Sequence, residues 1–218
     1  MTININNKKA FTLIEALVAI SILMIAIASP MTLVQKSLST ATLSKDQMIA
    51  AFLAQDAIEA VKNIRDQIAV ISISGTDEDW LVGSGGVSLS PCMCTGDSDD
   101  CNFDSASIKF CTIDTADSSV WKTGDIKEYI GDTSYSSAIL KINYNNSTNE
   151  KTFMKYDYSS SGADYSKFSR YINIKKTGGL DGNEAVVSVR VVWSSPQGIQ
   201  QNIDVQDFIY NYSVNLQH

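Results

Sequence analysis

Histidine is almost missing from this chain, which restricts the chemistry that the protein can perform. The single histidine is His218, at the end of the sequence. A Ser-His-Asp or Cys-His catalytic site needs an imidazole held inside a fold, so neither arrangement is expected. The stretch Gly83-Ser84-Gly85-Gly86 lacks the lysine and the helix that a phosphate-binding loop requires. We therefore do not expect an enzyme.

Positive charge is also scarce. The 218 residues include 17 lysines and arginines against 24 aspartates and glutamates, which gives a net charge of −7. An acidic surface has no general attraction for nucleic acid or anionic lipid. Only Lys175 and Lys176, together with Arg170 and Arg190, suggest a basic patch. We do not expect nucleic acid as a partner.

A long apolar stretch lies near the N-terminus. No charged side chain occurs from Ala16 to Ala28, and Ser21 is the only polar residue there. A helix of about 20–25 residues, rising about 1.5 Å per residue, crosses a hydrocarbon core of about 30 Å. We predict a transmembrane helix over residues 11–34. Lys8 and Lys9 keep its N-terminal side cytoplasmic by the positive-inside rule, so the rest of the chain would lie outside.

Glu15 is the one carboxylate in this predicted membrane helix. A charged side chain at the centre of a membrane helix costs about 2.5–3.5 kcal/mol on insertion scales, so such a residue usually has a function. The alternative is that Glu15 lies at the level of the headgroups, one turn into the helix, where the penalty is smaller.

The order of residue types at the N-terminus resembles a known signal. Two lysines, a small residue and an apolar segment with an early carboxylate follow one another in Lys8-Lys9-Ala10-Phe11-Thr12-Leu13-Ile14-Glu15 and on to about Ile27. This order resembles the N-terminal signal of type IV pilins and pseudopilins, which a prepilin peptidase cuts just before a phenylalanine that is then methylated. The resemblance implies a leader over residues 1–10, cleavage between Ala10 and Phe11, and N-methylation of Phe11. The family usually has glycine where this chain has Ala10.

The resemblance also gives Glu15 a function. Cleavage would leave an α-amino cation on Phe11 at the end of an apolar helix, and a buried cation needs a partner. We expect Glu15 of a neighbouring subunit to pair with this amine during assembly. The family implies three partners: other pilin subunits, the prepilin peptidase and an inner-membrane assembly platform. It also implies a single-pass inner-membrane protein that later joins a cell-surface filament.

Several functions are compatible with this N-terminus. The segment Leu53–Asp66 is similar to the matching helix of minor pilins and minor pseudopilins, which implies a structural subunit, and a minor one, of a type IV pilus-like filament. A pseudopilin of a type II secretion or DNA-uptake apparatus is an alternative. Another is a secreted, disulfide-bonded binding domain that begins at Ser29, because Ala26-Ile27-Ala28 matches the A-x-A pattern of ordinary signal peptidase sites.

Residues 35–68 are predicted to continue the membrane helix as an amphipathic helix. Apolar residues recur there with spacings of three and four, at Leu53, Ala57, Ile58, Val61, Ile64 and Ile68. No glycine occurs from Phe11 to Ile68, and Pro30 is the only proline in that range. We expect one long helix with a kink at Pro30, because proline removes a backbone donor and clashes with the preceding turn.

Residues 69–218 are predicted to form an exterior, β-rich head. β-branched or alternating runs indicate strands at 70–74, 87–89, 108–113, 138–144, 152–156, 168–176, 186–193 and 199–214, whereas 115–137 is typical of loops. In the strongest run Val187, Val189, Val191 and Trp193 share one face, opposite Ser188 and Arg190. The predicted fold class is α+β: a long N-terminal helix, transmembrane in its first half, packed against a C-terminal antiparallel meander, as in pilin-like heads.

All four cysteines lie in the predicted head, at Cys92, Cys94, Cys101 and Cys111. An even number of cysteines in an exported domain indicates disulfides. Cys92 and Cys94 are too close for an easy bond with each other, so we expect each to pair with Cys101 or Cys111. A zinc site is an alternative that the oxidising exterior disfavours.

Four aspartates lie beside these cysteines, at Asp97, Asp99, Asp100 and Asp104. This density is typical of solvated acidic loops and also of calcium sites. The twelfth position counted from Asp97 is Ile108, where an EF-hand loop has glutamate. We expect no cofactor, with calcium on these aspartates as an alternative.

Overall fold

The computed structural model describes residues 12–72, 79–83, 87–94, 99–115, 126–130, 138–145, 152–158, 164–177, 182–195 and 198–211. The chain divides into two units, residues 1–46 and residues 47–218. The predicted leader and the predicted cleavage site at Ala10 and Phe11 lie outside the described residues.

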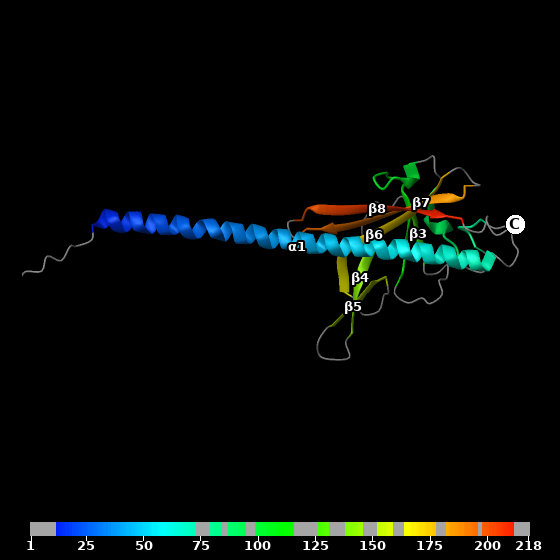
Figure 1. The fold of residues 1–218 in the computed structure, drawn as a ribbon, viewed down its shortest axis with the longest axis horizontal. Coiled ribbons are helices and arrows are strands. Elements are labelled where there is room, and N and C mark those ends of the chain that lie inside the picture. The colour runs from blue at the N-terminus through cyan, green and yellow to red at the C-terminus, as the bar shows by residue number, and fades with distance from the viewer. Residues whose placement is uncertain are drawn as a thin grey trace, which may run out of the picture. The chain divides into compact units, whose positions relative to one another are not determined.

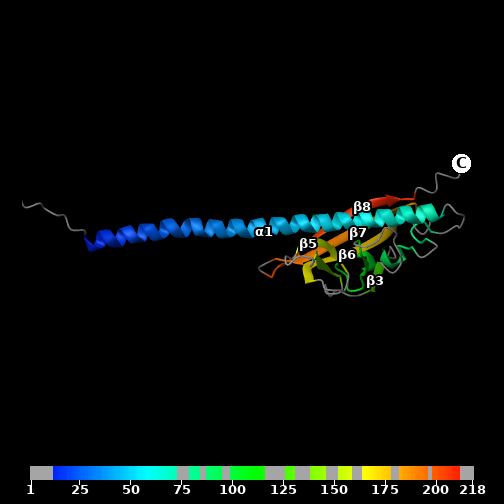
Figure 2. The same cartoon turned by 90° about the horizontal axis from the view of Figure 1, so that it is seen from below.

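Helix α1 runs from Leu13 to Ser72 and contains Pro30 rather than ending there (Figures 1 and 2). The long continuous helix is therefore confirmed. The strand predicted at residues 70–74 is wrong for 70–72, which form the end of α1. The reason is that Ile71 follows the fully buried Ile68 at helical spacing and packs against the same core, so tertiary packing outweighs its β-branched character.

The sheet of the head has strand β6 (Asp164–Thr177) at its centre (Figure 1). β7 (Glu184–Ser194) pairs with β6 along its length, and β8 (Gln200–Tyr210) pairs with β7, both antiparallel. The β7–β8 turn needs a glycine, because Gly198 has a φ of 77° and donates its N–H to the Ser195 carbonyl at 2.9 Å. These three strands form the predicted meander.

On its other side, β6 contacts two pairs of strands in succession. β4 (Ile139–Asn145) pairs with β5 (Thr152–Asp157), and β2 (Lys109–Ile113) pairs with β3 (Ile126–Ile130). β4 and β2 are antiparallel to β6, whereas the short β1 (Met93–Cys94) is parallel to it. The order β3-β2-β6-β4-β5 therefore differs from a meander of sequential strands.

Two local predictions in the head were also wrong. β3 lies inside the segment 115–137, which was predicted as loop. The sequence pattern of β3 is weak because the adjacent residues Lys127 and Glu128 are both exposed. The strand therefore lacks a clear alternation of apolar and polar residues. The strand expected at 87–89 is reduced to an isolated bridge between Val82 and Ser88.

The two faces of the sheet bury different clusters. One face packs against α1, and the main cluster joins Leu53, Ile64 and Ile68 of the helix to the apolar side of β7, formed by Val187, Val189, Val191 and Trp193. The predicted face of β7 is thus confirmed. A smaller cluster contains Phe110, whose ring stacks on Tyr129 at 5.1 Å and meets Tyr171 edge-on at 4.7 Å.

Candidate functional site

The described part of the first unit, residues 12–46, is almost entirely helical, and its surface is largely apolar from Leu13 to Val34. Every large aliphatic side chain from Leu13 to Val34 is more than half exposed. This segment is long and apolar enough to cross a membrane, and none of it is buried within the molecule. A helix that is apolar all round is stable only when lipid or other helices cover it.

Glu15 lies in the first turn of α1, on this apolar surface. Its backbone N–H donates to the Thr12 carbonyl at 3.1 Å, and a carboxylate here interacts favourably with the helix dipole. Among the described residues, the nearest basic residue along the helix is Lys36, 21 positions later, which corresponds to about 31 Å. A cationic partner for Glu15 must therefore come from the residues before Thr12 or from another molecule.

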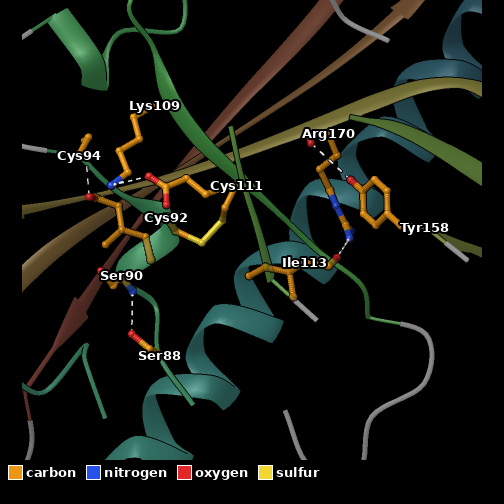
Figure 3. The surroundings of a disulfide bond; sticks show 11 residues. Ser88, Ser90, Cys92, Cys94, Lys109, Cys111, Ile113, Tyr158 and Arg170 are labelled. Atoms are coloured by element: carbon orange, nitrogen blue, oxygen red, sulfur yellow. Dashed lines mark hydrogen bonds and ion pairs between the residues drawn. A yellow bond between two sulfur atoms is a disulfide. The ribbon is translucent and has the colours of Figure 1, made fainter. Parts of the chain in front are cut away.

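Two disulfides hold the start of the head to the sheet. Cys92, at the end of the 3₁₀ helix η1 (Ser90–Cys92), is bonded to Cys111 of β2 (Figure 3). Cys94 is bonded to Cys101, at the end of η2 (Asp99–Cys101). All four cysteines are in disulfides, so no thiolate is available to bind zinc. The zinc alternative is therefore wrong.

Arg190 fixes the loop that follows the second disulfide. Its Nη1 donates to Asp104 at 2.5 Å, while Nε and Nη2 bind both carboxylate oxygens of Asp204 at 2.7 Å. The guanidinium also lies 5.0 Å from the centre of the Phe103 ring. The hydrogen bond from Arg190 lowers the pKa of Asp104 below its usual value. These contacts dock the loop on β7 and β8.

Calcium at the acidic loop stays a prediction. Asp97 lies outside the described residues, while Asp99 and Asp100 are in η2. Asp104 Oδ1 accepts a hydrogen bond from Arg190, so calcium would have to share this carboxylate with the guanidinium.

The sequence did not predict a fully buried arginine in the head. Arg170 is only 1 % exposed; its Nη1 donates to Asp56 at 2.8 Å and to the Leu53 carbonyl at 3.0 Å. Its Nη2 donates to the Ile113 carbonyl at 2.8 Å, and its guanidinium lies 5.9 Å from the Tyr158 ring (Figure 3). Burial raises the pKa of the Tyr158 phenol. Arg170 thereby joins α1, β2 and β6.

A signal for this contact was present in the sequence. Arg170 falls at two-residue spacing between Phe168, Ile172 and Ile174, on the side of β6 that faces the main cluster. A single arginine on an otherwise apolar strand face indicates a buried ion pair, although its partner cannot be named from spacing alone.

Comparison with known proteins adds one decisive match. Residues 5–29 match the prokaryotic N-terminal methylation motif. This is the type IV pilin signature. No curated protein and no solved structure matches the chain significantly. This motif supports a type IV pilin-like protein processed by prepilin peptidase, and it indicates a structural subunit that assembles with other pilins.

The head does not bring together the basic residues that suggested a DNA-binding patch. Arg170 is buried toward α1, whereas Arg190 lies on the opposite face of the sheet and is bound by two aspartates. Lys176 forms an ion pair with Asp79, and Lys175 is exposed. The interpretation of these four residues as one patch is therefore wrong.

The head contains a groove beside α1 with a volume of about 460 Å³. Its lining combines apolar and charged side chains: Ile49, Phe52, Leu53, Asp56, Thr115, Lys155 and Tyr156. Phe52 is 63 % exposed, which is unusual for a large aromatic side chain on a core helix. The sequence prediction singled out none of these residues as a site.

Proposed function

We propose that this protein is a structural subunit, and specifically a minor pilin, of a type IV pilus-like filament. The observation that supports this most directly is that the methylation motif at residues 5–29 leads into a helix whose apolar surface is exposed on all sides. Lipid covers such a helix before assembly, and neighbouring helices can replace the lipid afterwards.

Glu15 supplies the polar contact of this assembly. In the proposal, cleavage between Ala10 and Phe11 creates a methylated α-amine, which pairs with Glu15 of a neighbouring subunit. The position of Glu15 supports this, because no described basic residue of its own helix lies close enough to neutralise it. An unpaired carboxylate in hydrocarbon is costly, so pairing favours the assembled state over the isolated helix.

The proposal includes a pathway through the cell envelope. The subunit enters the inner membrane with Lys8 and Lys9 on the cytoplasmic side. The peptidase removes residues 1–10, and the assembly platform moves the subunit into the filament with its head exposed. The similarity of Leu53–Asp66 to minor subunits supports the placement as a minor pilin.

The test is the N-terminal residue of the mature protein, measured by mass spectrometry on material isolated from its native cell. A methylated Phe11 is the expected result. A start at Ser29 would instead mean cleavage by ordinary signal peptidase, and an intact Met1 would mean a membrane-anchored protein that is not processed.

Quantifying the subunit in purified surface filaments tests whether the protein is a minor pilin. A minor pilin is expected there at a small fraction of the main subunit. Recovery only in the cell envelope, with none in surface filaments, would contradict the pilus assignment and favour a pseudopilin.

A further inference from the structure

We propose that the disulfide between Cys94 and Cys101 is a site of thiol–disulfide exchange in the folded head, whereas the disulfide between Cys92 and Cys111 stays closed until the head unfolds. The partner at this site is a dithiol, either a small molecule or the paired cysteines of an oxidoreductase. This inference concerns the head alone and goes beyond the filament function proposed above.

The disulfide between Cys92 and Cys111 is sealed inside the head. Both residues are fully buried, and both belong to the main cluster, which also contains Ile64 and Ile68 of α1. Exchange requires a thiolate to reach one of the two sulfur atoms. A thiolate can therefore reach this bond only when the core between α1 and the sheet opens.

The disulfide between Cys94 and Cys101 lies closer to the solvent. Cys94 is 7 % exposed, whereas Cys101 is partly exposed and is followed by the exposed Asn102. The sequence separation of this pair is 7, against 19 for the other pair, so opening it frees a shorter segment of chain. An attacking thiolate is expected to meet the sulfur of Cys101 first.

Contacts other than the bond hold both of its ends in place. On one side, β1 carries Cys94 and pairs with β6, where Met93 is opposite Ile174. On the other side, the Nδ2 of the buried Asn173 donates to the Cys101 carbonyl at 2.9 Å. The Arg190–Asp104 contact holds the residues that follow. Opening the bond is therefore a local change, and the two sulfur atoms stay near each other for reclosure.

The exchange reaction needs no group other than the dithiol. One of its thiolates attacks the Cys101 sulfur and forms a mixed disulfide, while the Cys94–Cys101 bond breaks and Cys94 leaves as a thiolate. The second thiolate of the dithiol then attacks the first sulfur of the dithiol and releases Cys101 as a thiolate. The dithiol is oxidised by two electrons, and the two cysteines of the head take up protons from water.

The first experiment measures the rate at which each bond opens in the full chain, held in detergent without denaturant. Dithiothreitol is added, samples are alkylated at intervals, and the remaining disulfides are reduced and alkylated with an isotopically heavy reagent before mass spectrometry. Cys94 and Cys101 are expected to be labelled at least about tenfold faster than Cys92 and Cys111, with unchanged tryptophan fluorescence. Equal rates, the opposite order, or a change in fluorescence that accompanies the first opening would overturn the proposal.

A trapping experiment distinguishes the two kinds of dithiol. The probe is a thioredoxin in which serine replaces the second active-site cysteine, so that a mixed disulfide cannot be released by it. A mixed disulfide on Cys101 would support a protein dithiol as the partner, whereas opening by dithiothreitol without this adduct would support a small dithiol. A mixed disulfide on Cys94 would overturn the proposed order of attack.

Paired substitutions test whether opening is local. The variant with Cys94→Ala and Cys101→Ala is expected to keep the native tryptophan fluorescence. The matched variant with Cys92→Ala and Cys111→Ala removes a bond from the main cluster and is expected to lower the thermal midpoint further. An equal or larger loss in the first variant would contradict a local role for the Cys94–Cys101 bond.

Discussion

The contact between Arg170 and Asp56 predicts an asymmetric response to mutation. Among the described residues, Asp56→Ala leaves the fully buried guanidinium with two carbonyl acceptors, those of Leu53 and Ile113. Removing one partner of a buried ion pair costs about 3–5 kcal/mol, and the half-exposed position of Asp56 favours the lower end, about 3 kcal/mol. Arg170→Met leaves Asp56 hydrated and fills the site with an apolar side chain, so we expect a loss of only about 1–2 kcal/mol.

The double variant distinguishes this explanation from a simple loss of packing. Once Arg170 is methionine, Asp56→Ala removes only a carboxylate on the surface and its exposed hydrogen bond from Thr115, so its additional cost should fall below about 1 kcal/mol. Urea unfolding of the full chain in detergent, followed by the fluorescence of the buried Trp80 and Trp193, gives the four free energies. Additive effects, or a larger loss for Arg170→Met than for Asp56→Ala, would refute the reasoning.

Three further outcomes are expected. Gly83→Ala should lower stability by about 1–3 kcal/mol, because a Cβ would lie 2.9 Å from the Val87 carbonyl oxygen; an unchanged thermal midpoint would contradict this. The hydrogen bond from Lys62 lowers the pKa of Asp207 in the folded protein. The pair therefore contributes fully to the free energy of unfolding at pH values above the unfolded-state pKa of about 3.9, and this contribution is lost as the pH falls through the lower pKa of the folded state. Asp207→Asn should therefore reduce the loss of stability between pH 5 and pH 2, as measured by urea midpoints; an unchanged pH profile would argue against the pair. Glu15→Val should abolish filament incorporation while membrane insertion, measured by alkaline extraction, survives; normal incorporation would remove the proposed role of Glu15.

The sequence was most informative where structure depends on local spacing. The buried stripe of α1 repeats every three or four residues, and the inner face of β7 repeats every two, so both could be predicted without knowing their partners. The N-terminal motif is equally local, because the residues at 5–29 carry it in one uninterrupted segment.

The arrangement of the head depends on contacts that spacing does not encode. β2 pairs with β6 through Cys111 and Ile172, which are separated by three other strands in the sequence. This placement also decides the disulfides, since Cys111 on β2 lies beside η1 and Cys92, and Cys94 is left to Cys101. Spacing alone left both pairings open.

The exposure of Phe52 could not be predicted for a related reason. Phe52 follows an apolar pattern that also fits a core helix, and only the structure shows that it remains exposed while Leu53 is buried. Asp56 resembled one of the ordinary acidic residues on the outer side of α1, yet Arg170 reaches it from β6 across 114 positions of sequence.

The two parts of α1 differ in what stabilises them. From Leu13 to Leu38, the large aliphatic side chains of α1 are exposed in the described structure, and a helix of this kind is stable where lipid or other helices cover it. After residue 47, the same helix is held by a core, a buried arginine and the Lys62–Asp207 pair. Phe52 departs from this division, because it is an exposed apolar side chain on the half of the helix that already has a core. An exposed aromatic side chain on the packed half of the helix therefore does not follow from the core of the head, which buries Leu53 beside it.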